Sequence, residues 1–275
     1  MADPHLDIHP KLVADILVRF LREELRSAGF GRAVIGLSGG IDSAVSAALA
    51  VRAFGPEEVL GVLLPYRTSN ADSEAHARLV AESLSMHTRR IEISAMVDGY
   101  LDQEAVPAGM RRGNVMARAR MVVLYDMSED WRGLVIGTSN KTEMLLGYST
   151  LFGDSAHAAN PLGDLYKHQV VQLARHLELP REVIDKPPSA DLFEGQTDEE
   201  ELGFSYAEAD RLLVRLVDER LTEEELVEAG FQRDFVRLVA KRIVRNQYKR
   251  VPPVIAKLSH RTIGHDFRYL RDWMA

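Results

Sequence analysis

The feature that most constrains this chain is the stretch AVIGLSGGIDSAVSAALA at residues 33–50. A β-branched run at 33–37 leads through two adjacent glycines into an alanine-rich segment, which predicts a strand, a tight turn and a helix. Because the first amides of a helix have no partner within it, they attract anions, and glycines let a phosphate approach the backbone closely. The stretch therefore predicts a phosphate-binding loop at the carboxyl end of a parallel strand.

Strand-like runs alternate with helical segments around this loop. An amphipathic helix is expected at 11–30, and further strands at 59–65, 89–94 and 133–139. Residues 114–131 have apolar side chains at helical spacing, as in a crossover helix between two parallel strands. This alternation predicts an α/β fold, a doubly wound parallel sheet with helices on both faces.

From Asp164 onward the strand pattern disappears and helices are expected at 165–177, 205–217 and 232–247. With no internal repeat and no flexible linker, the chain is expected to form a single domain over residues 1–275. Its α/β core would span 1–163, and the helical C-terminal part of the same domain would span 164–275.

Two short acidic segments in the helical part could suggest metal binding. Thr197 with Glu200, and Thr222 with Glu225, have the spacing of a capping box, in which side chains pair with free amides at a helix start. Helix capping is therefore the preferred interpretation of both segments.

Composition excludes several classes of function. The chain has no cysteine, which excludes disulfides, thiolate zinc sites and a nucleophilic thiol. A formal net charge of −7 argues against broad nucleic-acid binding, and the basic cluster at 240–253 is interpreted as a solvated helix face. Without a long apolar run or a basic, apolar N-terminus, a soluble cytoplasmic protein with no membrane contact is expected.

The loop LSGGIDS differs from the common nucleoside-triphosphate loop, which has a lysine directly after its last glycine. Here Ile41 and Asp42 follow Gly40. A carboxylate beside phosphates needs a cation between them, so Asp42 is a candidate Mg²⁺ ligand. The alternative is that the glycines only form a tight turn and that Asp42 caps the helix.

The loop resembles that of the N-type ATP pyrophosphatases, which cleave ATP between its α- and β-phosphates. The further motifs GNVMARARM, GTSNKTEMLLGYSTLFGD, LYKHQV and KPPSADLFEGQTDEEELG resemble those of the NAD synthetase family in order and spacing, over residues 12–253. The resemblance implies an adenine nucleotide alpha hydrolase-like fold. It also implies a ligase that uses ATP and ammonia to convert deamido-NAD to NAD through an adenylate, releasing AMP and pyrophosphate.

The resemblance assigns roles to particular residues. Asp42 and Lys167 would be catalytic, Asp42 and Glu143 would bind Mg²⁺, and Arg118, Tyr248 and Lys249 would contact deamido-NAD. ATP would be bound by the loop and by three later residues, namely Gly36, Leu37, Ser38, Gly39, Gly40, Ile41, Asp42, Ser43, Thr138, Lys167 and Ser189.

The residues alone leave plainer interpretations open for several of these positions. Thr138 could be a helix cap, Glu143 a solvated helix charge and Lys167 a surface lysine. Ser189 could form a turn after two prolines, and Arg118 has other arginines beside it.

The segment TLFGDSAHAAN departs from the family pattern. Leu151 and Ala158 replace a lysine and an acidic residue there, which puts the substrate contacts in doubt, and His157 or Asn160 could replace them. The segment looks closer to the synthetase domain of glutamine-dependent enzymes, whose amidase domain uses a cysteine nucleophile. This chain has no cysteine, so ammonia would come from solution or from a separate glutaminase.

Two other functions remain as alternatives. One is another adenylating ATP pyrophosphatase, such as a tRNA thiolase, and the other is a nucleotide-binding partner subunit of an amidotransferase. The absence of cysteine and the acidic charge count against the thiolase. The family resemblance also implies a homodimer.

Overall fold

A computed structural model describes residues 5–104, 109–188 and 198–263. Four parallel strands form its central sheet, in the order β3-β2-β1-β4. They are β1 (Ala33–Gly36), β2 (Val59–Leu63), β3 (His87–Arg90) and β4 (Leu134–Val135). The chain adds β2 and β3 on one side of β1 and returns to add β4 on the other, so the order reverses beside β1. The predicted doubly wound parallel sheet is confirmed.

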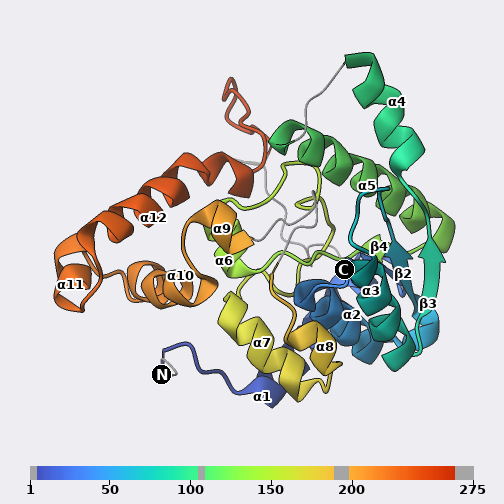
Figure 1. The fold of residues 1–275 in the computed structure, drawn as a ribbon, viewed down its shortest axis with the longest axis horizontal. Helices are drawn as coiled ribbons and strands as arrows, with labels where there is room; N and C mark the ends of the chain where they lie inside the picture. Colours follow the sequence, from blue (N-terminus) through green and yellow to red (C-terminus); the bar gives the residue numbers. More distant parts are fainter. Residues whose placement is uncertain (1–4, 105–108, 189–197, 264–275) are drawn as a thin grey trace.

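Helices cover both faces of the sheet (Figure 1). Helix α1 (Pro10–Ser27) precedes β1, and between the strands lie α2 (Ile41–Phe54), η1 (Pro56–Glu58), α3 (Ala71–Ser83), α4 (Ser94–Glu104) and α5 (Met110–Trp131). The expected helix at 11–30 and the expected crossover helix are therefore both present, and the crossover helix begins four residues earlier than the pattern indicated.

Alternating side chains explain why the sheet carries helices on both faces. Ala33 and Ile35 of β1 pack into an apolar cluster with α1, α2 and α7, whereas Val34 points into a second cluster with α4 and α5. In β2, Leu60 and Val62 join that second cluster. Strands that are apolar on both sides must be covered on both sides, as in other parallel sheets.

The third strand lies two residues earlier than the sequence pattern indicated. β3 is His87–Arg90, where the apolar residues suggested 89–94. The amides of Ile91 and Ile93 still donate to the carbonyls of Leu63 and Pro65, at 2.9 and 3.0 Å. The chain therefore continues beside β2 past the end of β3, and its apolar residues serve this extension.

After β4 comes the short helix α6 (Lys141–Leu146), and the described residues from Asp164 onward are mainly helical, as predicted. They contain α7 (Lys167–His176), α8 (Arg181–Ile184), α9 (Asp198–Leu202), α10 (Tyr206–Leu213), η2 (Val214–Asp218), α11 (Glu223–Glu228), α12 (Arg233–Arg245) and η3 (Gln247–Arg250). The helix expected at 205–217 changes to a π-helical turn in η2. A separate apolar cluster forms the core of this helical part, with Leu146, Leu212 and Val239 among its members.

The acidic segment at Thr222 is a capping box, as expected. The Thr222 hydroxyl accepts the amide of Glu225, and the Glu225 carboxylate accepts the amide of Thr222 at 2.7 Å. The other expected box begins at Thr197, which lies outside the described residues.

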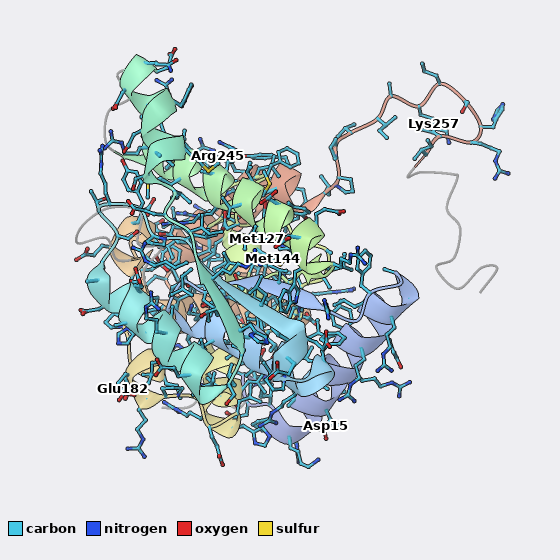
Figure 2. All side chains as sticks on the ribbon, turned by 90° about the vertical axis from the view of Figure 1, so that its right-hand side faces the viewer. Asp15, Met127, Met144, Glu182, Arg245 and Lys257 are labelled. Atoms are coloured by element: carbon cyan, nitrogen blue, oxygen red, sulfur yellow. The ribbon has the colours of Figure 1, made fainter. Side chains whose placement is uncertain are left out.

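Beyond η3 the chain leaves the body of the protein. Figure 2 shows this segment, with Lys257 on it, extending away from the helices and the sheet. Its apolar residues Val254 and Leu258 are 91% and 92% exposed. No helix in the described part of the chain is long and apolar enough to cross a membrane.

Candidate active site

A cleft of about 1390 Å³ opens at the carboxyl ends of the strands, where parallel α/β sheets bind ligands. Its lining comes from the loop after β1, the segment after β4, and the starts of α6 and α7. Thirteen of the predicted site residues line it, namely Gly36, Leu37, Ser38, Gly40, Ile41, Asp42, Ser43, Arg118, Thr138, Glu143, Lys167, Tyr248 and Lys249. Ser189 lies outside the described residues.

Hydrogen bonds among its own residues hold the loop after β1 in shape. The Ser38 hydroxyl accepts the amide of Gly40 at 3.2 Å, and the Ser43 hydroxyl donates to the carbonyl of Gly40 at 2.9 Å. Gly40 is the N-cap of α2 and no described side chain caps this helix start. The first amides of α2 therefore remain available for an anion in the cleft.

Gly39 lies below the cleft surface and makes the turn of the loop possible. Its φ is +75°, and a Cβ there would lie 2.1 Å from the carbonyl oxygen of Ser73 at the start of α3. Only glycine fits this combination of positive φ and close backbone approach. The glycine pair thus packs the loop directly against α3.

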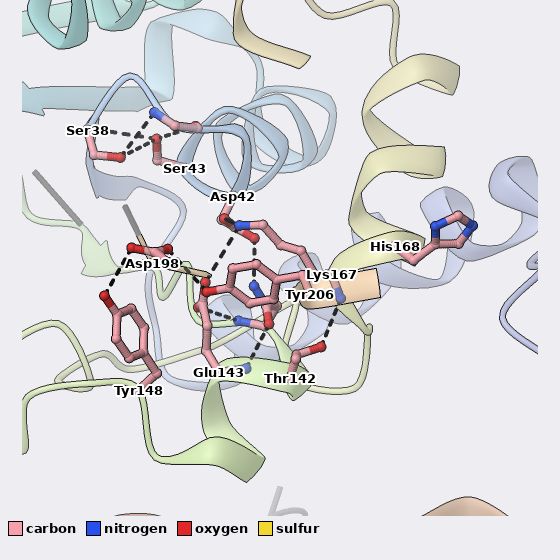
Figure 3. Close-up of polar contacts among 12 residues, drawn as sticks. Ser38, Asp42, Ser43, Thr142, Glu143, Tyr148, Lys167, His168, Asp198 and Tyr206 are labelled. Atoms are coloured by element: carbon pink, nitrogen blue, oxygen red, sulfur yellow. Dashed lines mark hydrogen bonds and ion pairs between the residues drawn. The ribbon is translucent and has the colours of Figure 1, made fainter. Parts of the chain in front are cut away.

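A buried ion pair joins the loop to the start of α7. The Lys167 ammonium contacts the Asp42 carboxylate and lies 3.6 Å from the Glu143 carboxylate, as Figure 3 shows. The three side chains are 8%, 16% and 17% exposed, respectively. Lys167 is therefore no surface lysine, and Glu143 is no solvated charge.

The environment of the pair shifts two pKa values. Burial and the negative charge of Asp42 raise the pKa of Glu143 to about 8, against the opposing effect of Lys167. Burial by itself would lower the pKa of Lys167, but the charges of Asp42 and Glu143 raise it above its usual value. The lysine is therefore charged at neutral pH, and its main counter-ion is Asp42.

Asn140 joins the two carboxylates and was not assigned a role from the sequence. Its side-chain amide donates to Asp42 at 2.9 Å, and its side-chain carbonyl accepts the amide of Glu143 at 2.9 Å. It is also the N-cap of α6, in a capping box with Glu143. Thr138 is therefore not the cap of α6, and Asp42, whose carboxylate contacts Asn140 and Lys167, is not the cap of α2.

A second buried network fixes the start of α7. The Thr142 hydroxyl donates to Asp210 at 2.5 Å and accepts the backbone amide of Lys167 at 3.0 Å. The other Asp210 oxygen accepts the amide of His168 at 2.8 Å. Thr142 and Asp210 are fully buried, and burial raises the pKa of Asp210 to about 6. An acidic group at a helix start satisfies its free amides and interacts favourably with its dipole.

Two tyrosines hold a further carboxylate at the cleft. Tyr206 and Tyr148 donate to the two oxygens of Asp198, at 3.1 and 3.0 Å, and Tyr148 also donates to Glu201 at 2.8 Å. Burial is the main cause that raises the pKa of both tyrosines. The ring of Tyr206 also lies 5.1 Å from the Lys167 ammonium. The contacts that join Asp198 to these two tyrosines could not be inferred from the sequence.

The residues expected to contact deamido-NAD lie at one end of the cleft. The Arg118 guanidinium donates to the carbonyl of Leu151 at 3.2 Å, so it contacts the segment that departs from the family pattern. The Lys249 ammonium donates to the carbonyls of Gly147 and Ser149, at 2.7 and 2.6 Å. Burial lowers the pKa of Lys249, and Tyr248 is 57% exposed.

The basic cluster at 240–253 is not only a solvated helix face, which corrects the expectation from sequence. Arg242 and Asn246 donate to the carbonyl of Leu146, and Arg250 donates to the carbonyls of Met144 and Leu145. These side chains satisfy the free carbonyls at the end of α6, where the positive charge of the two arginines is stabilising. The cluster therefore holds the helix that carries Glu143.

His157 and Asn160, considered as replacements for lost substrate contacts, are not among the residues that line the cleft. The ring of His157 lies over Gly137, where a Cβ would come within 2.6 Å of it. Asn160 donates to the carbonyl of Ser139 at 2.9 Å. Both side chains pack against the segment after β4.

The donor set at Asp42 suits a magnesium ion. Among the described residues there is no cluster of three or more His, Asp or Glu side chains arranged to hold a metal by themselves. Mg²⁺ is commonly held by one or two carboxylates together with substrate phosphates and water. Asp42 and Glu143 beside an anion-binding loop fit that arrangement.

Comparisons with known proteins show which family this chain belongs to. The family model described as NAD synthase matches residues 13–253. An NH(3)-dependent NAD(+) synthetase from Chlorobium phaeobacteroides strain BS1 is 56% identical over 268 residues, or 98% of this chain and 97% of that protein. The structure of the NH3-dependent NAD synthetase from Campylobacter jejuni, with nitrate, has a TM-score of 0.79 and 33% identity, covering 91% of this chain and 100% of that one. The NMN synthetase from Francisella tularensis has a TM-score of 0.81 and 32% identity, covering 92% and 100%. The chain belongs to the NAD synthase family.

Proposed function

We propose that this protein is a ligase that converts deamido-NAD to NAD with ATP and ammonia, releasing AMP and pyrophosphate. One observation carries the proposal. A phosphate-binding loop, a buried Asp42–Lys167 pair and the Glu143 carboxylate meet in one cleft at the carboxyl end of a parallel sheet. The family membership and the 56% identity to an NH(3)-dependent NAD(+) synthetase support the same activity.

The reaction has two steps. A nicotinate carboxylate oxygen attacks the α-phosphorus of ATP, the bond to the oxygen bridging the α- and β-phosphates breaks, and pyrophosphate leaves with the electron pair. Ammonia then attacks the carbonyl carbon of the adenylate, loses a proton and displaces AMP. Both steps develop negative charge on oxygen, which oriented amides and cations stabilise.

The residues of the cleft divide this work. The first amides of α2 and the hydroxyls of Ser38 and Ser43 would bind phosphate oxygens. Thr138 and Lys167 would contact ATP from the β4 side of β1. Ser189 is also assigned to the ATP site, because the family resemblance places it there. Asp42 and Glu143 would hold Mg²⁺. When bound, this ion neutralises phosphate charge and orients the phosphate chain.

The metal role of Asp42 is tested by Asp42→Asn, which keeps the size of the side chain. We expect a folded protein that has lost most of its turnover, because an amide is a weaker Mg²⁺ ligand than a carboxylate. Turnover is measured over a range of Mg²⁺ concentrations. Unaltered turnover at limiting Mg²⁺ would remove Asp42 from the metal site.

The end of the cleft with Arg118, Tyr248 and Lys249 would bind deamido-NAD. One solved relative is an NMN synthetase, so the size of the acceptor is the first thing to measure. Purified protein with Mg²⁺, ATP and ammonium is given either deamido-NAD or nicotinic acid mononucleotide, and AMP, pyrophosphate and the amidated product are followed together. We expect a higher kcat/KM with deamido-NAD, and a clear preference for the mononucleotide would replace the proposed substrate.

The ammonia source follows from the cysteine count. A chain with no cysteine cannot use a cysteine nucleophile to hydrolyse glutamine. We expect NAD with ammonium, and none with glutamine alone. AMP release without NAD would indicate that a separate glutaminase must deliver ammonia.

The proposal includes a homodimer. Large apolar side chains are exposed along α4 and α5, among them Met96, Tyr100, Met110 and Tyr125. Such exposure supports association with a second copy, which sedimentation velocity would measure. We further propose that residues 1–275 form one domain that acts in the cytoplasm on small-molecule substrates and binds no nucleic acid. The hydrogen bonds that Asp210 accepts from Thr142 and His168 support a single domain, because they join the helical C-terminal part to the cleft.

A further inference from the structure

Lys186 lies at the cleft and has no role in the site described above. Its ammonium donates to the hydroxyl of Ser73 at 3.0 Å, and both residues line the cleft. Lys186 follows α8, which packs against α2 and α3. The position of Lys186 is therefore fixed by the packing of α8, next to α2, the helix that begins at the loop after β1.

Ser73 is in direct contact with that loop. A Cβ on Gly39 would lie 2.1 Å from the Ser73 carbonyl oxygen, so the start of α3 touches the backbone of the glycine pair. An ammonium held on the Ser73 hydroxyl is therefore a close neighbour of the loop. Lys167 contacts the same loop directly at Asp42, whereas Lys186 contacts Ser73, the residue whose carbonyl lies against Gly39.

The charges around the loop favour a second cation there. The Asp42 carboxylate contacts the Lys167 ammonium, so it takes up much of the charge of this lysine. Glu74, next to Ser73, pairs with Arg78 at 2.7 Å and with Arg90 at 2.9 Å, so its charge is balanced. A further cation beside the loop would stabilise a bound phosphate chain, because charge-assisted hydrogen bonds to phosphate are among the strongest.

We infer that Lys186 is a second phosphate-contacting cation, which binds the part of ATP that leaves as pyrophosphate. The identity of this phosphate chain rests on the proposed function. The lysine would leave the Ser73 hydroxyl when ATP binds and donate to phosphate oxygens. It would then stabilise the charge that develops on pyrophosphate as its bond to the α-phosphorus breaks.

The test measures pyrophosphate binding and turnover separately. Inorganic pyrophosphate is titrated calorimetrically, with Mg²⁺ present, into the full chain and into Lys186→Gln, Lys186→Arg and Ser73→Ala. Lys11→Gln is the matched control, because Lys11 is 71% exposed on α1 and pairs there with the exposed Asp15. Kinetics with ATP and with deamido-NAD follow on the same preparations, and thermal unfolding verifies that each variant is folded.

We expect Lys186→Gln to bind pyrophosphate about tenfold more weakly and to lower kcat/KM for ATP, with the KM for deamido-NAD unchanged. Lys186→Arg should keep most of the affinity, and Ser73→Ala should lose less than Lys186→Gln, because the ammonium remains. Unchanged pyrophosphate affinity in Lys186→Gln would overturn the inference. Equal losses in Ser73→Ala and Lys186→Gln would also overturn it, since Lys186 would then only support the fold.

The two proposals can fail separately. If the wild-type protein forms no NAD but Lys186→Gln still weakens pyrophosphate binding, the proposed function is wrong and the phosphate contact stands. If the wild-type protein forms NAD and Lys186→Gln behaves like Lys11→Gln in both assays, the inference is wrong and the proposed function stands.

Discussion

The hydroxyl of Thr142 in α6 donates a hydrogen bond of 2.5 Å to the buried carboxylate of Asp210 in α10. The same hydroxyl accepts the backbone amide of Lys167 at 3.0 Å. One side chain thus connects the helix that carries Glu143, the helix that begins at Lys167, and the helical C-terminal part. The position of Lys167 opposite Asp42 depends on a residue more than forty positions away along the chain.

Replacing Thr142 by valine tests this connection, because valine keeps the shape and removes the hydroxyl. The change leaves the amide of Lys167 and one oxygen of Asp210 without their partner, which should lower the free energy of unfolding by about 2 kcal/mol. We expect kcat to fall more than the KM values rise. Urea unfolding and steady-state kinetics measure both effects. Thr142→Ser keeps a hydroxyl and should restore most of each, and a serine variant as impaired as the valine variant would contradict the prediction.

The raised pKa of Asp210 predicts how stability changes with pH. The folded pKa of about 6 lies above the ordinary pKa of an aspartate, so the folded state holds the proton more tightly than the unfolded chain does. The stabilisation is complete below about pH 4 and is lost as the pH rises through about 6, by about 3 kcal/mol in total. Asp210→Asn cannot titrate. The free energy of unfolding of the wild type relative to Asp210→Asn should therefore fall between pH 4 and 7, and a constant difference would show that the pKa is not raised.

Removing the charge of Lys167 should be costly in the absence of a metal. Lys167→Met leaves Asp42 buried without its cation, which should lower the free energy of unfolding by about 3–5 kcal/mol. If Asp42 and Glu143 hold Mg²⁺, added Mg²⁺ should recover part of this loss. Lys11→Met, at an exposed pair, should change the free energy of unfolding by less than about 1 kcal/mol and should not respond to Mg²⁺. Equal responses of the two variants to Mg²⁺ would count against the metal site.

The two loop glycines should differ in their tolerance of a methyl group. Gly39→Ala places a Cβ 2.1 Å from the Ser73 carbonyl at a φ of +75°, so the loop or α3 must move. Gly40 has a φ of −94°, and a Cβ there would meet only the Ser38 hydroxyl, at 3.3 Å. We expect Gly39→Ala to bind ATP at least about tenfold more weakly than Gly40→Ala. Equilibrium binding of ATP to both variants tests this prediction. Equal affinities would contradict it, because the loop would then accept a methyl group at Gly39 without loss of binding.

Lys249 offers a way to separate support of the fold from substrate contact. Lys249→Met removes a cation from the carbonyls just after α6, and Arg250→Met removes one from the carbonyls in its last turn, so each should lower the free energy of unfolding by about 1–2 kcal/mol. Arg250 is not among the residues that line the cleft. If Lys249 also contacts deamido-NAD, only Lys249→Met should raise the KM for deamido-NAD beyond the change shared by both variants. The same KM in both variants would leave Lys249 with a supporting role.

The parallel sheet and the loop were predictable because both are local. Strands apolar on every side chain, separated by helical segments, predict a sheet covered on both faces, and two glycines between a strand and a helix predict an anion-binding turn. The boundary of β3 was not predictable to the residue. The apolar residues Ile91 and Ile93 follow β3 and still run beside β2. The sequence pattern does not distinguish this extension from the strand itself.

The supports of the site were missed because each joins residues distant in sequence. Asn140 lies within a quoted motif, but its contact with Asp42 spans 98 positions. In the sequence Asp210 looks like any acidic residue on an amphipathic helix. The basic residues of the C-terminal cluster look like a solvated helix face. Burial decides the role of each of these side chains, because a buried polar group needs a hydrogen-bond partner and the sequence does not show which groups are buried.

The sequence by itself determined the alternation of strands and helices, the glycine-containing loop between β1 and α2, and the absence of a cysteine nucleophile. Each of these depends on neighbouring residues or on composition. Only the tertiary structure decided that Asp42, Lys167 and Glu143 share one buried site, and that Thr142 and Asp210 fix the helix from which Lys167 projects. The reason is physical, because charges and hydrogen bonds gain their strength from the low dielectric of a packed interior, and packing is set by the whole fold.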